Sequence, residues 1–317
     1  MSLDSAAGQV QEFEATLCVP CGNKLGECPR WDDIRQRVCW LDIEGKRFWQ
    51  LDLSRGSSDE DEVRSFELPA RAGSFCLTES GEYVFAFEDG FSFFNPETGE
   101  RHRITESFEP GLRTRMNDGR VDRQGRYVVG GHVEKGSEPL TNVYRLNEDL
   151  QVEVLLEGVR CSNSIAFSPG EGQMMYFADT MRDPAEIWCF RDYLSSGMSR
   201  SPEVFARPAG RPDGSALDAE GGLWNAEFGG GRVVRYSPDG RISAIVKVLV
   251  RYTTCVAFGG PDMQTLYITD ASPFRLSKPK LEALPEGHAG GLFSVRVPYR
   301  GLPESKFRGC SATLRSE

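Results

Sequence analysis

Alternating apolar and polar positions recur along the chain in short runs of four to seven residues. The first clear pair of runs is 37–42 and 47–52, which are separated by a short turn. Alternation with a period of two is typical of a half-buried β-strand, and two such runs around a turn predict a hairpin. No window of twelve or more residues keeps a helical period between capping signals, so the pattern predicts an all-β protein. Similar pairs follow five more times, and their first runs are 81–87, 125–130, 174–178, 222–226 and 266–269.

The hairpins follow one another at a nearly constant step. One aromatic or β-branched residue in each first run serves as a marker, and successive markers are 44, 43, 49, 48 and 43 residues apart. Strand repeats of about 40 to 50 residues are the signature of a β-propeller, whose sheets pack radially into a closed ring. The six markers are Trp40, Val84, Tyr127, Tyr176, Trp224 and Tyr267.

The repeat predicts a single domain. We expect residues 1–317 to fold as one six-bladed β-propeller, with an N-terminal strand completing the last blade. Residues 1–14 are polar and acidic, and are expected to form a flexible N-terminus. Residues 54–64 are rich in Ser, Asp and Glu, and are expected to form an exposed acidic loop.

A small or polar residue pair lies about ten to thirteen residues before each marker. Equivalent positions of a closed ring converge on its axis, so these pairs are expected to meet at the mouth of the central channel. Carboxylate and amide oxygens gathered there suit Ca²⁺, Mg²⁺ or Mn²⁺ well, and Zn²⁺ or Fe²⁺ less specifically. The alternative is a wet channel mouth lined with solvated polar groups. The converging residues are Glu27, Asn117, Asn163 and Asp213.

Three more residues are candidates for the same cavity. Arg115 lies two positions before Asn117, and residues i and i+2 of a strand share a face. A guanidinium there can bind an anionic or polyhydroxyl ligand, although an exposed surface arginine is the alternative. His132 and Glu134 alternate on one face just past the inner strand of the third blade. A lone histidine is more often structural or exposed, so only its position in the repeat favours a role for His132 in the cavity.

Composition narrows the classes of function. The formal net charge of −10 disfavours a nucleic acid or an anionic membrane surface as partner. The chain has no run of about eighteen apolar residues and no apolar signal-peptide core near its N-terminus, so we expect a cytoplasmic protein. The nine cysteines include a Cys18-x-x-Cys21 pair, which is compatible with a redox pair or half a zinc site. Free thiols are expected, since no second such pair accompanies it.

Five segments carry motifs that occur in the same order in a known family. Residues 25–31 are similar to L-G-E-x-P-x-W, and residues 115–126 to R-x-N-D-G-x-x-D-x-x-G-R. Residues 161–168 are similar to S-N-G-x-x-x-S, 176–180 to Y-x-x-D-T/S, and 212–221 to P-D-G-x-x-x-D-x-x-G. With these motifs the chain resembles the SMP-30/gluconolactonase/LRE-like family over nearly its whole length.

The resemblance implies a six-bladed propeller with one divalent metal ion near its axis. Ca²⁺ is the first expectation, and Zn²⁺, Mn²⁺, Mg²⁺ or Fe²⁺ are alternatives. Two positions depart from the family pattern: Ser164 replaces a usual Gly, and His132 replaces a more common Thr or Met. The implied metal ligands are Glu27, Asn163 and Asp213. The implied substrate-binding residues are Arg115 and Asn117, with His132 and Glu134 lining the pocket.

The activity implied by the resemblance is hydrolysis of a sugar lactone, such as gluconolactone, to the aldonic acid. Asp213 is then both a metal ligand and the catalytic base for the attacking water. One alternative is a phosphotriesterase-like esterase, because carbonyl and phosphoryl groups both need polarisation. Two further alternatives are a calcium-binding regulatory protein with little catalysis and a propeller that binds other proteins. Arg115 and Asn117 favour an enzyme that binds a small-molecule lactone, because metal binding alone does not need them.

Overall fold

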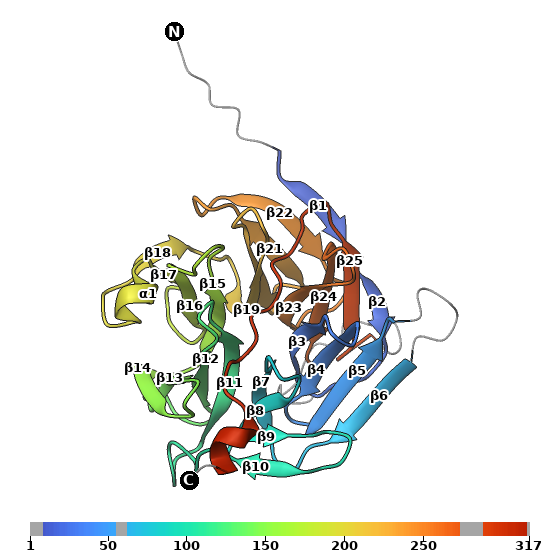
Figure 1. Ribbon diagram of the computed structural model, residues 1–317. Helices are drawn as coiled ribbons and strands as arrows, with labels where there is room; N and C mark the ends of the chain where they lie inside the picture. The colour runs from blue at the N-terminus through green and yellow to red at the C-terminus, as the bar shows by residue number, and fades with distance from the viewer. Residues whose placement is uncertain (1–8, 55–61, 273–287, 316–317) are drawn as a thin grey trace.

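Six β-sheets stand around a central axis in the computed structural model, which describes residues 9–54, 62–272 and 288–315. Figure 1 looks down that axis. Within the described residues, five sheets have four strands and one has five. The inner strand of each sheet contacts the inner strands of both neighbouring sheets, which closes the ring. The predicted all-β, six-bladed propeller is therefore confirmed.

The first three blades each run from an inner to an outer strand along the chain. Blade one consists of β3 (Gly26–Asp32), β4 (Arg37–Asp42), β5 (Arg47–Asp52) and β6 (Glu62–Glu67). Blade two consists of β7 (Ala72–Leu77), β8 (Tyr83–Phe87), β9 (Gly90–Phe94) and β10 (Arg101–Arg103). Blade three consists of β11 (Thr114–Val121), β12 (Tyr127–Val133), β13 (Thr141–Leu146) and β14 (Val152–Val159).

The last three blades continue the same order. Blade four consists of β15 (Ser162–Phe167), β16 (Met175–Asp179), β17 (Ile187–Phe190), the short helix α1 (Tyr193–Ser196) and β18 (Glu203–Ala206). Blade five contains β19 (Arg211–Leu217), β20 (Leu223–Phe228), β21 (Arg232–Tyr236) and β22 (Ile242–Lys247). Blade six contains β23 (Thr253–Gly259), β24 (Thr265–Asp270) and β25 (Leu292–Arg296), and a 3-10 helix, η2 (Ser311–Arg315), follows. Among the described residues, no helix is long and apolar enough to cross a membrane.

The N-terminal segment closes the ring. β2 (Thr16–Val19) pairs antiparallel with β25, so an N-terminal strand completes blade six as predicted. β1 (Gln11–Glu14) adds a fifth strand to blade five and runs parallel to β22. The prediction of a flexible segment over 1–14 is therefore wrong for residues 11–14, because they are held in a strand ladder. Residues 1–8 lie outside the described residues.

The acidic segment 54–64 is described only in part. Residues 62–64 are exposed, as expected, but they begin β6 and pair with β5, so the predicted loop is wrong there. Charged side chains are common on exposed edge strands, which explains why composition alone suggested a loop. Residues 55–61 lie outside the described residues.

Aromatic and β-branched side chains hold the blades together. All six marker residues are buried, and Trp40 and Trp224 are fully so. Trp40 stacks on Trp49 of the next strand, with ring centroids 5.8 Å apart. Phe48 of blade one and Phe75 of blade two pack edge to face, with their ring centroids 5.0 Å apart. The residues that set the sequence repeat therefore form the core that fixes the blades around the axis.

Each inner strand carries a register shift near its start. The shifts fall at 27–30 in β3, 116–119 in β11, 163–166 in β15 and 212–215 in β19. A β-bulge of this kind bends the strand and re-aims its side chains. The six inner strands begin at the same face of the ring, so the bulges lie together at one end of the channel.

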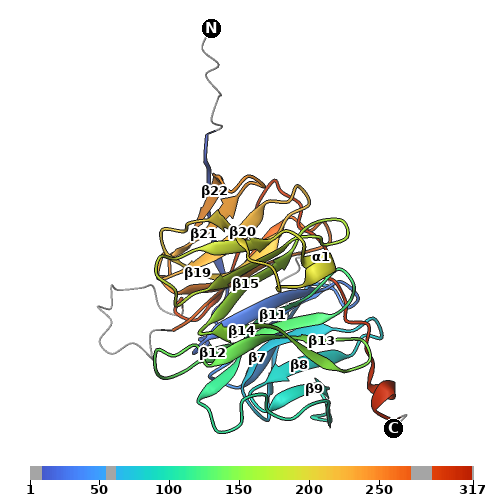
Figure 2. The same ribbon diagram turned by 90° about the vertical axis from the view of Figure 1, so that its left-hand side faces the viewer.

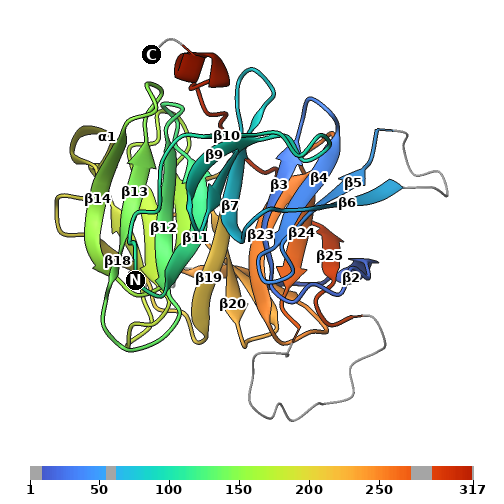
Figure 3. The same cartoon turned by 90° about the horizontal axis from the view of Figure 1, so that it is seen from below.

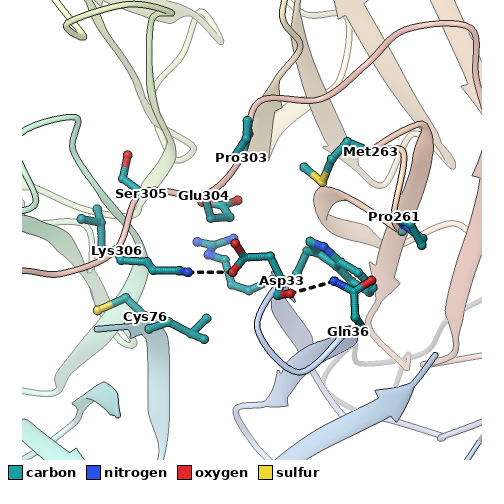
Figure 4. A pocket seen from close by; sticks show the side chains of 14 residues that line it. Asp33, Gln36, Cys76, Pro261, Met263, Pro303, Glu304, Ser305 and Lys306 are labelled. Carbon is teal, nitrogen blue, oxygen red and sulfur yellow. Dashed lines mark hydrogen bonds and ion pairs between the residues drawn. The ribbon is translucent and has the colours of Figure 1, made fainter. Parts of the chain in front are cut away.

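The C-terminal segment 301–310, called the strap, crosses the opposite face of the ring. Figure 1 shows it passing over the centre, and Figures 2 and 3 show the C-terminus beyond the edge of the blades. Gly301 bridges to Asp218 just beyond β19, and Phe307 bridges to Thr78 just beyond β7. A cavity of about 140 Å³ lies beneath the strap, with Glu304 at its edge (Figure 4). Because the strap lies where inner strands end, this cavity is separate from the predicted site.

Candidate active site

The polar residues predicted at the channel mouth are buried there, and two of them are hydrogen-bonded to each other. Glu27, Asn117, Asn163 and Asp213 each have no more than 6% of their surface exposed. Asn117 Nδ2 donates a hydrogen bond to Asn163 Oδ1 at 3.1 Å, which joins blades three and four. Asn117 Nδ2 also donates to the Ser162 carbonyl at 2.9 Å. The repeat therefore brings residues of different blades into one buried polar cluster.

Glu27 and Asp213 form a buried pair of carboxylates. Burial, and then the charge of Asp118, raises the pKa of Glu27 to about 8. Burial, and then the charges of Glu27 and Asp118, raises the pKa of Asp213 well above its usual range. Burial is the larger cause of both shifts, and the nearby acidic charges add to it, so a bound cation would compensate the cluster.

Asp118 is a third buried carboxylate of the cluster, which the sequence analysis did not select. Burial also raises the pKa of Asp118, although Arg30 opposes this shift. Its Oδ2 accepts a hydrogen bond from the backbone N–H of Ile165 at 2.9 Å. The signal was present in the sequence, because Asp118 directly follows Asn117 at the start of the third inner strand. The hydrogen bond to blade four indicates that Asp118 positions the neighbouring strand.

The predicted ligand set fits a hard cation. Within the described residues, Asp213 Oδ1 is buried and accepts no hydrogen bond. Asn163 Nδ2 donates to Thr180 Oγ1 at 2.7 Å, which fixes which end of the amide is the oxygen. No three His, Cys, Asp or Glu side chains form a ligand group in the part of the chain described, but this set has two carboxylates and one amide. Such oxygen donors suit Ca²⁺.

Arg115 is held against the cluster. Its guanidinium is buried, and Nη1 donates to Asn117 Oδ1 at 2.6 Å. Burial lowers the pKa of Arg115, and the nearby Glu44 and Glu134 oppose that shift. The register of β11 and β12 places His132 opposite Arg115, and His132 also bridges to Cys161 at the start of blade four. Arg115 and His132 therefore lie beside the predicted metal ligands.

Glu134 lies in a second charged cluster, centred on Arg71. Arg71 binds both oxygens of Glu134, at 2.6 and 3.1 Å, and pairs with Glu88 at 2.6 Å. Glu44 lies between the clusters, 3.4 Å from Arg71 and 3.9 Å from Arg115. Sequence analysis missed Arg71 and Glu44. Arg71 immediately precedes the inner strand of blade two, where the repeat could have located it, but Glu44 lies in a turn without a repeat signal.

Ser164, where the family usually has Gly, lies in the bulge of β15. Its φ of 59° is in the left-handed region, which glycine adopts at lower cost. Its Oγ lies 2.6 Å from Ser215 Oγ, so the hydroxyl forms a hydrogen bond that Gly cannot make. The same bulge geometry is present in β3, where Cys28 has a φ of 51°. Ser164 therefore adopts a backbone conformation that suits glycine and adds a buried link between blades four and five.

Comparison with known proteins places the chain in a family. Residues 25–272 match the family described as "SMP-30/Gluconolactonase/LRE-like region", as the motifs indicated. An L-arabinolactonase from Azospirillum brasilense is 38% identical over 304 residues, which cover 93% of this chain and 96% of that protein. A 6-deoxy-6-sulfogluconolactonase from Pseudomonas putida is 34% identical, covering 90% of this chain and 95% of that protein.

A solved structure has the same fold as this chain. The calcium-binding protein regucalcin from Agrobacterium tumefaciens superimposes with a TM-score of 0.84 at 27% identity. The match covers 95% of this chain and 100% of that chain. The likeness therefore extends over the whole ring and does not stop at the motifs.

Proposed function

Because the chain belongs to the SMP-30/gluconolactonase/LRE-like family, we propose that it is a metal-dependent hydrolase that opens sugar lactones to aldonic acids. The observation that carries the proposal is the buried set of Glu27, Asn163 and Asp213 beside the Arg115–Asn117 pair. The lactonase names of the two relatives above support the substrate class. A small-molecule sugar lactone is the proposed partner.

Glu27, Asn163 and Asp213 would hold one divalent cation, with Ca²⁺ favoured by their hard oxygen donors. When bound, the ion would polarise the lactone carbonyl and acidify a water molecule. The calcium-binding name of the regucalcin structure supports this choice of metal. Mg²⁺, Mn²⁺, Zn²⁺ and Fe²⁺ are the other ions to compare.

Asp213 is the proposed catalytic base. Its Oδ1 accepts no hydrogen bond within the described residues, so it has a lone pair available for the proton of the attacking water. The water oxygen bonds to the carbonyl carbon, the ring C–O bond then breaks, and the proton passes to the leaving ring oxygen. The product is the open aldonic acid. Arg115 and Asn117 orient the sugar hydroxyls, and His132 and Glu134 line the pocket.

A lactone panel tests the proposal. Metal-stripped protein is assayed on arabinono- and gluconolactones, and the five divalent ions are added back one at a time. Hydrolysis of a phosphotriester, assayed in parallel, distinguishes the phosphotriesterase-like alternative from a lactonase. We expect lactone opening that returns with one or more of the ions. Tight Ca²⁺ binding with no turnover of any lactone would favour the regulatory binding protein instead.

Metal binding is expected to strengthen as the pH rises toward about 8. The pKa of Glu27 is raised to about 8, so below that pH the side chain must release a proton to act as a ligand. Each released proton makes the affinity rise about tenfold per pH unit. Between about pH 4 and 8 the folded metal-free state binds more protons than the unfolded state, so its stability falls with rising pH.

Calorimetric titration with Ca²⁺ between pH 6 and 8 checks this expectation. Two buffers of different ionisation enthalpy give the number of protons released. Glu27→Gln is the control variant, which should bind more weakly and with a smaller pH slope. An affinity that is constant over this pH range would contradict the assignment of Glu27 as a ligand.

Arg71→Met is expected to raise the KM for the lactone by about tenfold, with a smaller effect on kcat. The substitution removes the guanidinium that fixes both oxygens of Glu134, so the carboxylate no longer has a single orientation. Steady-state kinetics on gluconolactone measure the two constants separately. Arg101→Met is the matched control, because Arg101 pairs with Asp89 at 2.6 Å in the same blade but on its outer strand. Equal kinetics for the two variants would exclude a role for Arg71.

A further inference from the structure

An open groove of about 640 Å³ lies over the end of blade five where β19 begins. Its lining includes Thr180 and Arg182 of blade four, Arg211 and Arg232 of blade five, and Arg251 and Tyr252 just before blade six. The inner strands start at this face, so the groove opens beside the channel mouth, on the face opposite the strap.

The groove adjoins the predicted metal ligands through Thr180. Thr180 Oγ1 accepts a hydrogen bond from Asn163 Nδ2 at 2.7 Å and donates to the Pro212 carbonyl at 2.7 Å. Arg211 lies two residues before Asp213 on the same strand. A ligand in the groove would therefore lie next to the candidate metal ligands.

The groove is basic in a strongly acidic protein. Four arginines and two acids line it, whereas the whole chain has a formal net charge of −10. One of the acids, Glu227, is already paired with Arg232 at 2.8 Å. Arg211 and Arg251 are exposed, and they make no ion pair within the described residues. The Arg182 guanidinium lies over the Trp188 ring, 4.7 Å from its centroid. Arg211 and Arg251 are therefore the unpaired arginines that line the groove against the single carboxylate of Asp183 within the described residues.

The other side of the channel mouth has the opposite character. There the three carboxylates of Glu44, Glu88 and Glu134 outnumber the two arginines, Arg71 and Arg115. This charge distribution orients an asymmetric substrate, because its anionic end is repelled from blades one to three and attracted to blades four to six. Guanidinium groups bind phosphate, sulfonate and carboxylate groups through paired, charge-assisted hydrogen bonds.

We propose that the groove lined by Arg211 and Arg251 binds an anionic substituent on the sugar lactone, at the end of the molecule away from the ring carbonyl. The substrate class is then a sugar lactone that carries a phosphate, sulfonate or carboxylate group. This inference rests on the proposed lactonase activity, because it deepens the specificity of the same site.

Binding and kinetics with matched probes test the groove. Calorimetry measures the affinity of the Ca²⁺-loaded protein for gluconate and for gluconate 6-phosphate. Gluconolactone and its 6-phosphate, 6-sulfonate and 6-carboxylate analogues are then compared by kcat/KM, which identifies the preferred anion. We expect the 6-phosphate to bind about tenfold to a hundredfold more tightly than gluconate, and added salt to reduce the difference.

In the double variant Arg211→Met/Arg251→Met, the ratio of the affinity for gluconate 6-phosphate to that for gluconate should fall to nearly one. Arg241→Met is the matched control, because Arg241 is an exposed arginine of blade five that pairs with Asp239 at the opposite end of the blade. Equal affinity of the unmodified protein for the charged and neutral probes, or an unchanged preference in the double variant, would overturn the groove assignment. If no lactone is opened while the charged probe still binds through Arg211 and Arg251, the proposed activity fails and the groove stands.

Discussion

Replacing Asp213 with alanine is expected to abolish lactone hydrolysis and metal binding together, with a loss of turnover of at least about 10³-fold. The change removes one of two buried carboxylates and the Oδ1 atom that is proposed to take the proton from water. The fold should survive, because an uncompensated buried acid does not stabilise the metal-free protein. Initial rates on gluconolactone and a Ca²⁺ titration of the same preparation measure the two losses.

Asp270→Asn is the matched control for this variant. Asp270 is also a buried aspartate, and burial raises its pKa to about 7. Its Oδ2 accepts a hydrogen bond from the Gly290 N–H at 2.8 Å, which an asparagine oxygen can also accept. The control should keep both turnover and Ca²⁺ binding. Full lactonase activity in a folded Asp213→Ala protein would exclude Asp213 as base and ligand.

Phe307→Ala is expected to lower the free energy of unfolding by about 3 to 5 kcal/mol, which is the usual cost of emptying a buried phenylalanine site. Phe307 lies in the strap, is fully buried and packs in the cluster formed by blades two and three. Urea unfolding followed by tryptophan fluorescence measures the change. The lactone kinetics of the folded protein should change much less, because the strap crosses the face opposite the candidate active site.

Leu249→Ala is the control for this second prediction. Leu249 is a large apolar residue outside the core, with 65% of its surface exposed, so its removal should change stability by no more than about 0.5 kcal/mol. If Phe307→Ala unfolds at the same urea concentration as the unmodified protein, the strap does not stabilise the ring.

Regular repetition made the blades and the polar cluster predictable. Successive inner strands repeat at similar spacing, so counting back from the markers located Glu27, Asn163 and Asp213 before any contact was known. The count varies between blades because the turn after the inner strand differs in length, 33–36 in blade one, 168–174 in blade four and 218–222 in blade five, and because the marker holds a different position in its strand. The sequence therefore predicted which residues share the axis, but not which hydrogen bonds join them.

Features that do not repeat were not predictable in the same way. Arg71 acts through carboxylates of three different blades, and no local pattern records such contacts. The basic groove depends on arginines at the starts of β19 and β21 and in two connections, and neither position repeats from blade to blade. β1 pairs parallel with a blade that is distant in sequence, so its short polar run resembled a flexible tail.

The N-terminal strands have a consequence for how the protein is made. β2 pairs with β25 through Thr16 and Ser294, which are 278 residues apart. β22 therefore has to be synthesised before β1 can find its partner, and β25 before β2 can find its own. Ring closure also carries the entropy cost of the longest loop in the chain. The nascent protein is thus most exposed to aggregation immediately before its last blade is complete.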